Sequence, residues 1–168
     1  IQTAMKLTKD INLLTKKEFL SIFGNIFEKS DWIANKVFNL KPFENSEDLV
    51  IKMMNIYENC TNEKIIEIFN LHPKLAIEKK LTSFSSKEQI GAKLDTCSKE
   101  ELEEFEYLNK NYEKKFGFPF IFAVKGKNKN EILNNFRQRI KNNFEVEFKE
   151  AKTQVKKIAL LRFDEILK

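Results

Sequence analysis

The sequence is short of the residues that build metal sites, disulfide scaffolds and membrane spans. It holds one histidine, two cysteines, four glycines and three prolines among 168 residues. Cys60 and Cys97 are too few for a disulfide scaffold, and no Cys-x-x-Cys or His-rich spacing indicates zinc. No apolar run approaches the roughly 18 residues that a membrane-spanning helix needs. We therefore expect a globular protein of a reducing compartment, cytoplasmic, without a metal and without membrane contact.

Recognisable targeting signals are also missing. The N-terminus lacks a charged segment followed by an apolar one. The last three residues, Ile-Leu-Lys, differ from the Ser-Lys-Leu peroxisomal signal. Residues 1–4 precede Met5 and are expected to be a cloning remnant. The length suits one domain with a sizeable core, so we expect residues 1–168 to form a single domain.

Arginine is scarce, although the chain is mildly basic. Lysine and arginine together number 30 against 25 acidic residues, which gives a formal charge of +5. The lysines alternate with glutamate and asparagine along the whole chain, as on an ordinary solvated surface. Proteins that bind nucleic acid more often cluster their basic residues and favour arginine. The pattern argues against a nucleic-acid partner, and a nucleic-acid-binding helical domain stays only as a minor alternative.

Few glycines and prolines interrupt the chain, and its apolar residues recur at helical spacing. Thr15 with Glu18 and Ser98 with Glu101 predict capping boxes. Single N-caps are predicted at Ser30, Ser46 and Thr61. The sequence thus predicts an all-α, single-domain helical bundle, with helices over residues 13–27, 31–39, 47–59, 62–71, from 85 and from 98 onward, and one or two long helices over 131–166.

The apolar run at 116–124 is the exception to the helical pattern. Gly117 and Pro119 block a helix, and no other segment offers the run a strand partner. We expect a buried extended segment rich in phenylalanine. Its N–H and C=O groups must find partners inside the protein. A polar small molecule and ordinary backbone pairing in the core are both open as partners.

The single histidine, His72, is the only imidazole available for proton transfer. Pro73 disfavours helical geometry at His72, which predicts that a helix stops there. Further on, Ser85 is predicted as an N-cap, with Glu88 as its capping-box partner. A helix N-terminus suits an anionic or carbonyl-rich ligand. The alternative is that His72 is a loop residue with a structural hydrogen bond and that Glu88 only caps.

Arg162 continues an apolar stripe of the last predicted helix. The stripe steps by three and four residues. An arginine on such a stripe either extends along the rim towards solvent or is held inside by a partner. For the second case, a buried carboxylate or a planar polar ligand fits the guanidinium fork. The stripe consists of Phe144, Phe148, Ala151, Val155 and Ile158.

With these residues in place, the sequence resembles the OHCU decarboxylases, which act on 2-oxo-4-hydroxy-4-carboxy-5-ureidoimidazoline in urate breakdown. The likeness runs nearly end to end, and the order and spacing of its motifs make it specific. Lys29 and Lys41 depart from the histidine and arginine usual in that family. The motifs are Phe27-Glu-Lys-Ser-Asp-Trp-Ile-Ala34, Lys41-Pro-Phe43, Leu71-His-Pro-Lys-Leu-Ala76, Ser85-Ser-Lys-Glu-Gln-Ile-Gly-Ala92, Leu108-Asn-Lys-Asn-Tyr112, Phe116-Gly-Phe-Pro-Phe-Ile-Phe-Ala-Val-Lys-Gly126 and Lys157-Ile-Ala-Leu-Leu-Arg162.

The resemblance implies a cofactor-independent decarboxylase that gives S-allantoin, on an all-α fold that is commonly a homodimer and needs no metal. It implies His72 as the catalytic histidine and Glu88 as its partner carboxylate. The residues that it implies for substrate binding are Pro73, Ser85, Ser86, Lys87, Glu88, Gln89, Phe120, Ile121, Phe122, Ala123, Val124 and Arg162. The main alternative is a non-catalytic helical interaction protein on the same scaffold.

Overall fold

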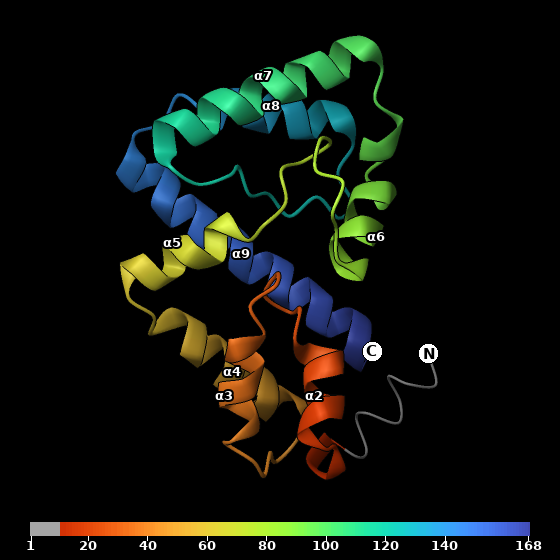
Figure 1. Cartoon of the computed structure of the whole chain (residues 1–168), viewed down its shortest axis with the longest axis vertical. Coiled ribbons are helices and arrows are strands. Elements are labelled where there is room, and N and C mark those ends of the chain that lie inside the picture. Colours follow the sequence, from red (N-terminus) through yellow and green to blue (C-terminus); the bar gives the residue numbers. More distant parts are fainter. Residues whose placement is uncertain (1–10) are drawn as a thin grey trace. The chain divides into compact units, whose positions relative to one another are not determined.

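The computed structural model describes residues 11–168, which are built from helices and loops (Figure 1). Over these residues no strand forms, so the all-α prediction is confirmed. The expected remnant at residues 1–4 lies outside the described part. The elements are the 3₁₀ helices η1 (Ile11–Leu13) and η2 (Leu94–Thr96) and the α-helices α2 (Lys16–Phe23), α3 (Asp31–Phe38), α4 (Ser46–Glu58), α5 (Asn62–Asn70), α6 (Ser83–Gly91), α7 (Lys99–Phe116), α8 (Lys129–Arg139) and α9 (Phe144–Leu167).

The chain divides into two compact units. The first holds the residues up to Ile68 together with Lys156–Lys168, and the second holds Phe69–Val155. Helix α9 begins in the second unit and ends in the first. No helix of residues 11–168 has the length and hydropathy that crossing a bilayer requires. The same residues include no group of three or more His, Cys, Asp or Glu placed to hold a metal ion.

In the first unit, α2 packs on α3 and α3 packs on α4. Aromatic rings fill the space that their apolar faces enclose. The Phe27 and Tyr57 rings stack with centroids 4.9 Å apart, and Phe163 of α9 lies 6.0 Å from Phe23 of α2. Burial of these large rings is the main stabilising contribution of this unit.

In the second unit, α7 and α8 pack side by side (Figure 1). The loop after α7 carries the phenylalanine-rich segment, which runs through this unit without forming a strand. Phe120 is buried and stacks on Phe136 of α8, with centroids 3.8 Å apart and planes at 9°. Tyr112 of α7 meets the same Phe120 ring edge-on at 5.5 Å. The predicted buried, extended segment is confirmed.

Several predicted helix starts are confirmed. Thr15 and Ser98 close capping boxes with Glu18 and Glu101, and the Thr61 hydroxyl accepts the Lys64 N–H at 3.2 Å.

One predicted cap is wrong, and another is only partly confirmed. The N-cap of α4 is Asn45, whose side chain accepts the Asp48 N–H at 2.8 Å, so Ser46 is already helical. Ser30 is the N-cap residue of α3, as predicted, but its hydroxyl makes no capping hydrogen bond and donates to the Glu28 carbonyl. At α4, the neighbouring Asn45 makes the capping bond in place of Ser46.

Candidate functional site

His72 lies where a helix stops, as predicted. Helix α5 ends at Asn70, and the backbone N–H of His72 donates to the Phe69 carbonyl at 3.1 Å. The His72 side chain is buried, with 7% of the residue exposed. Pro73 next to it is half-buried. The imidazole is therefore held in a sheltered loop of the second unit, the setting that proton transfer by histidine requires.

Two side-chain amides form hydrogen bonds to one peptide group of this loop. The Asn109 amide of α7 donates to the Leu75 carbonyl at 3.1 Å. On the other side of the same peptide, the Ala76 N–H donates to Gln89 Oε1 of α6 at 3.0 Å. Ala76 has a φ of 70°, a conformation that residues with a Cβ rarely adopt. The two amides thus hold the loop after His72 in one strained shape.

Gln89 is oriented by this contact. Its oxygen accepts the Ala76 N–H, so its nitrogen must point elsewhere. Gln89 is buried with 6% exposed, and within residues 11–168 its Nε2 makes no hydrogen bond. A buried donor without an acceptor is costly, and such groups are rare in folded proteins. The arrangement offers a fixed N–H donor to the acceptor oxygen of a ligand.

The start of α6 differs from the prediction. The helix begins at Ser83 with Thr82 as its N-cap, and Thr82 and Ser85 close the capping box. The Thr82 hydroxyl accepts the Ser85 N–H at 3.2 Å, and the Ser85 hydroxyl accepts the Thr82 N–H at 3.0 Å. The prediction of Ser85 as N-cap and Glu88 as its partner is wrong, because this capping box forms one turn earlier.

The corrected start changes what α6 can offer a ligand. The N–H groups of Ser85 and Ser86 donate to the Thr82 hydroxyl and to the Thr82 carbonyl, so these two N–H groups already have partners. Glu88 sits in the helix body, half-buried, and Lys87 is exposed. Ser85 and Gln89 are four residues apart and both buried, so they share one face. The predicted site residues of α6 can therefore contact a ligand through their side chains.

The backbone of the phenylalanine-rich segment is anchored by side chains of α8 and α9. Arg139 Nη1 donates to the Ile121 carbonyl at 2.6 Å. The Ala123 N–H donates to Gln154 Oε1 at 2.9 Å. Phe120, Ile121 and Val124 are buried, whereas Phe122 and Ala123 are half-buried. At Ile121 and Ala123, the backbone groups thus find their partners inside the protein. These partners are side chains and not other backbone groups.

Arg139 belongs to a buried ion pair of the second unit. Its Nη2 lies 2.9 Å from Glu147 Oε1, with 7% and 0% of the two side chains exposed. The Tyr112 hydroxyl donates to the same carboxylate oxygen. Asn142 donates to Oε2 at 3.0 Å. Burial raises the pKa of Tyr112 well above its usual range, so the phenol remains a hydrogen-bond donor.

Arg162 belongs to the first unit, whereas His72, Glu88 and the Phe120–Val124 segment belong to the second. Arg162 is 2% exposed. Its Nη2 lies 3.1 Å from the buried carboxylate of Glu28, and Nη1 donates to the Asn25 carbonyl at 2.8 Å. The solvent-directed alternative is wrong, and the alternative with a buried carboxylate is confirmed.

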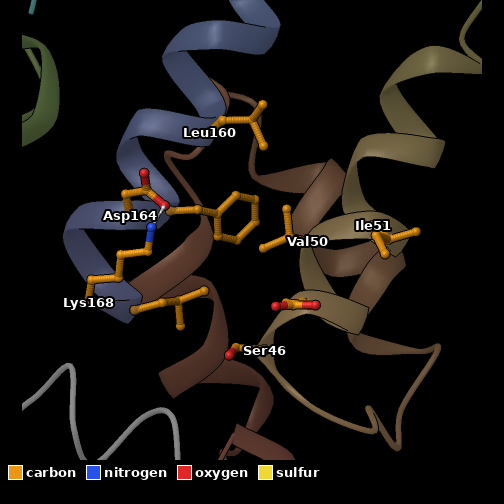
Figure 2. A pocket seen from close by; sticks show the side chains of 9 residues that line it. Ser46, Val50, Ile51, Leu160, Asp164 and Lys168 are labelled. Atoms are coloured by element: carbon orange, nitrogen blue, oxygen red, sulfur yellow. Dashed lines mark ion pairs between the residues drawn. The ribbon is translucent and has the colours of Figure 1, made fainter.

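A surface hollow of about 450 Å³ in the first unit is separate from every predicted site residue. Figure 2 shows Leu160, Asp164 and Lys168 of the end of the chain facing α4 residues across it. The Asp164 and Lys168 side chains pair with each other at 3.3 Å. The hollow is lined by Ser46, Glu47, Val50, Ile51, Leu160, Phe163, Asp164, Leu167 and Lys168.

Four polar residues that bond to predicted site residues or to their loops were not singled out in the sequence: Glu28, Asn109, Arg139 and Gln154. Glu28 and Asn109 stand inside quoted family motifs, so the motifs carried the signal. Gln154 lies three residues after Ala151 on the apolar stripe of α9, as Arg162 lies four after Ile158. A polar residue at an apolar stripe position was the available signal for Gln154.

Known proteins match the chain over nearly all of its length. The sequence profile described as OHCU decarboxylase matches residues 12–164. A uric acid degradation bifunctional protein of Bacillus sp. (strain TB-90) is 37% identical over 160 residues, covering 95% of this chain and 32% of that protein. This chain therefore spans about a third of that relative's length.

A second relative has a matching length. The 2-oxo-4-hydroxy-4-carboxy-5-ureidoimidazoline decarboxylase of Haloferax volcanii is 34% identical over 157 residues, covering 94% of both chains. Among solved structures, the crystal structure of (S)-allantoin synthase aligns with a TM-score of 0.75 and 27% identity. That alignment covers 95% of this chain and 54% of the other. With a profile match that spans almost the whole sequence and a relative of the same length, this chain belongs to the OHCU decarboxylase family.

Proposed function

We propose that this chain catalyses the cofactor-independent decarboxylation of 2-oxo-4-hydroxy-4-carboxy-5-ureidoimidazoline to S-allantoin in urate catabolism. The observation that carries the proposal is the end-to-end match to a decarboxylase of the same length. The buried imidazole of His72 and the half-buried carboxylate of Glu88 lie in one compact unit. In this reading the chain is a carboxy-lyase.

The reaction needs a place for the electrons of the breaking carbon–carbon bond. Many decarboxylases use a cofactor as the electron sink, but this substrate has a conjugated C=N next to the carboxylated carbon. Loss of CO₂ leaves an electron-rich, enol-like intermediate. Protonation of the neighbouring carbon from one face then gives a single enantiomer. The protein has to position the substrate, stabilise the developing charge and control the protons.

His72 is the general acid–base group and acts on the hydroxyl of the reacting carbon. Glu88 orients the imidazole or holds the ureido N–H groups. Because the N–H groups of Ser85 and Ser86 are already bonded to Thr82, recognition by this part of α6 is assigned to side chains. The Gln89 Nε2 donor suits a carbonyl of the substrate, since its orientation is fixed by Ala76.

The phenylalanine-rich segment supplies apolar walls and backbone groups for the amide edges of the substrate. Its apolar side chains exclude water, which favours loss of the charged carboxylate. Family resemblance assigns Arg162 to a carbonyl or the carboxylate of the substrate, and the Arg162 guanidinium pairs with Glu28. The remaining residues of the proposed contact surface are Pro73, Ser85, Ser86 and Lys87.

We further propose that residues 1–168 act as one catalytic domain, as a cytoplasmic homodimer. Family resemblance supports the single domain and the homodimer. Sedimentation of the purified chain measures the oligomeric state, and a twofold mass is the expected result.

The test of the activity is direct. Urate oxidase and the hydrolase that follows it generate the unstable substrate in the cuvette, and the purified chain is added. We expect accelerated loss of the substrate absorbance and a circular dichroism signal of S-allantoin. Racemic allantoin forming at the uncatalysed rate would refute the proposal and favour a non-catalytic interaction protein. Retention on heparin with a steep salt dependence would instead favour a nucleic-acid-binding domain.

A further inference from the structure

We infer that Gln154 and Arg139 are positioning residues that hold the Phe120–Val124 backbone in the geometry its ligand requires. The inference rests on the proposed function, because it takes this segment as part of the substrate site. It adds two residues, from α8 and α9, that act on the substrate only through the backbone that they fix. Their contacts all lie within the second unit.

Arg139 and Gln154, the two anchors, bind the same short stretch of backbone. Arg139 donates to the Ile121 carbonyl at 2.6 Å, and Gln154 accepts the Ala123 N–H at 2.9 Å. In an extended chain, backbone groups two residues apart point to the same side and those of the residue between them point to the other. The anchors therefore turn the N–H and C=O of Phe122 away from α8 and α9.

Phe122 is suited to face a ligand. It is half-buried between the buried Ile121 and the half-buried Ala123. Within residues 11–168, its backbone N–H and C=O take part in no hydrogen bond. Half-buried backbone groups without a protein partner remain open to water or to a ligand. Because the bonds to Ile121 and Ala123 lie on one side of the chain, the backbone N–H and C=O of Phe122 point to the other side.

The two anchors are themselves rigidly held. The Arg139 guanidinium lies 4.5 Å from the centre of the Phe120 ring and pairs with the fully buried Glu147. The Gln154 amide donates to Glu150 Oε2 at 2.9 Å, which fixes its oxygen towards Ala123. A planar guanidinium with several donors loses little freedom when it makes one more bond.

Gln154 is the better residue for a test, because removing Arg139 would leave the Glu147 charge buried and unpaired. Gln154→Met keeps the length of the side chain and removes the acceptor for Ala123. We expect KM for the ureidoimidazoline to rise about tenfold while kcat stays within about twofold. Substrate that is bound through a displaced backbone binds less tightly, although the reacting groups are untouched.

Two further variants make the test specific. Gln138→Met makes the same chemical change at an exposed position of α8 and should leave KM unchanged. Exchanging the pair, as Gln154→Glu with Glu150→Gln, keeps an acceptor for the Ala123 N–H and a donor from position 150. This exchange variant should recover KM to within about threefold of wild type.

A readout independent of activity is hydrogen exchange of the Ala123 amide by NMR. Exchange should speed up in Gln154→Met and return towards the wild-type rate in the exchange variant. Should Gln154→Met fail to fold, Gln154→Asn, one methylene shorter, removes the same contact. An active wild type with an unmoved KM in Gln154→Met overturns this inference alone. A wild type without turnover refutes the proposed function, and the inference falls with it.

Discussion

The loop that carries His72, the proposed acid–base residue, is held by two side-chain amides. The loop leaves α5, and the Leu75–Ala76 peptide is held between Asn109 and Gln89. Pre-organised catalytic groups owe their efficiency to such supporting contacts. The same contacts leave the Gln89 nitrogen as a buried donor without a hydrogen-bond partner among residues 11–168, which suits its proposed contact with the substrate.

His72→Ala should reduce kcat/KM by about two to four orders of magnitude, the usual contribution of an acid–base group. The variant should stay folded, because the truncated residue lies in the loop after α5 and keeps its backbone bond to the Phe69 carbonyl. Turnover of the freshly generated substrate measures the loss, and far-ultraviolet circular dichroism checks the fold. Unchanged turnover would remove His72 from the mechanism.

Single residues were predictable from the sequence only where local chemistry dictates them. Pro73 forces the helix to stop before His72, and that prediction is confirmed. The cap at Ser85 is wrong because Thr82, three residues earlier, closes an equally good box. Since Glu88 carries no cap, Glu88→Ala removes its carboxylate without weakening the start of α6. The pairing of Arg162 with Glu28 depends on tertiary packing, which no local pattern encodes.

At the scale of elements, the transition from α7 into the phenylalanine-rich segment depends on one glycine. Gly117 is the C-cap of α7 and has a φ of 78°, where a residue with a Cβ is strained. The glycine at the end of α6, Gly91, has no such φ, and a Cβ there would meet no atom within 4 Å.

The two glycines give a matched pair of substitutions. Gly117→Ala should lower the free energy of unfolding by about 1–2 kcal/mol through backbone strain. Gly91→Ala should raise it by roughly 0.5–1 kcal/mol, because alanine is the better helix former. Urea denaturation followed by circular dichroism measures both. Equal effects at the two positions would contradict the assigned strain.

The helices themselves were largely predictable, since apolar spacing and capping boxes are local signals. The single predicted region over 131–166 is two helices, α8 and α9, with a break after Arg139. The extended segment was predicted from Gly117 and Pro119, and it is confirmed. Its anchors were not predictable, because Arg139 and Gln154 bind backbone atoms of distant residues. A sequence pattern shows which side chains share a face and leaves open which carbonyl they meet.

At the scale of the whole molecule, acid should weaken the fold through carboxylates with lowered pKa values. Hydrogen bonds from Arg137 lower the pKa of Glu104 from its ordinary value of 4.5. Bonds from the Ser98 backbone and from Lys129 do the same for Glu101. Because each folded-state pKa lies below the unfolded value, the stabilisation is present above about pH 4.5 and is lost as the pH falls further.

Glu104→Gln isolates one part of this effect. The melting temperature of the variant should fall less between pH 6 and pH 3 than that of wild type, because one linked carboxylate is gone. The difference should be small, since both side chains of the Arg137–Glu104 pair are partly exposed. Thermal melts at several pH values measure it. An identical pH dependence in both proteins would show that this pair contributes nothing.

Helix α9 is one uninterrupted helix, although its residues are divided between the two units. Val155 and Lys156 are consecutive helical residues on either side of that division. A helix propagates cooperatively, so losing its hydrogen bonds at one point frays the turns on both sides. A proline introduced near the middle of α9 would therefore disturb the helix at Gln154 on one side and at Arg162 on the other. A single substitution would weaken both the Gln154 bond to Ala123 and the Arg162 pair with Glu28.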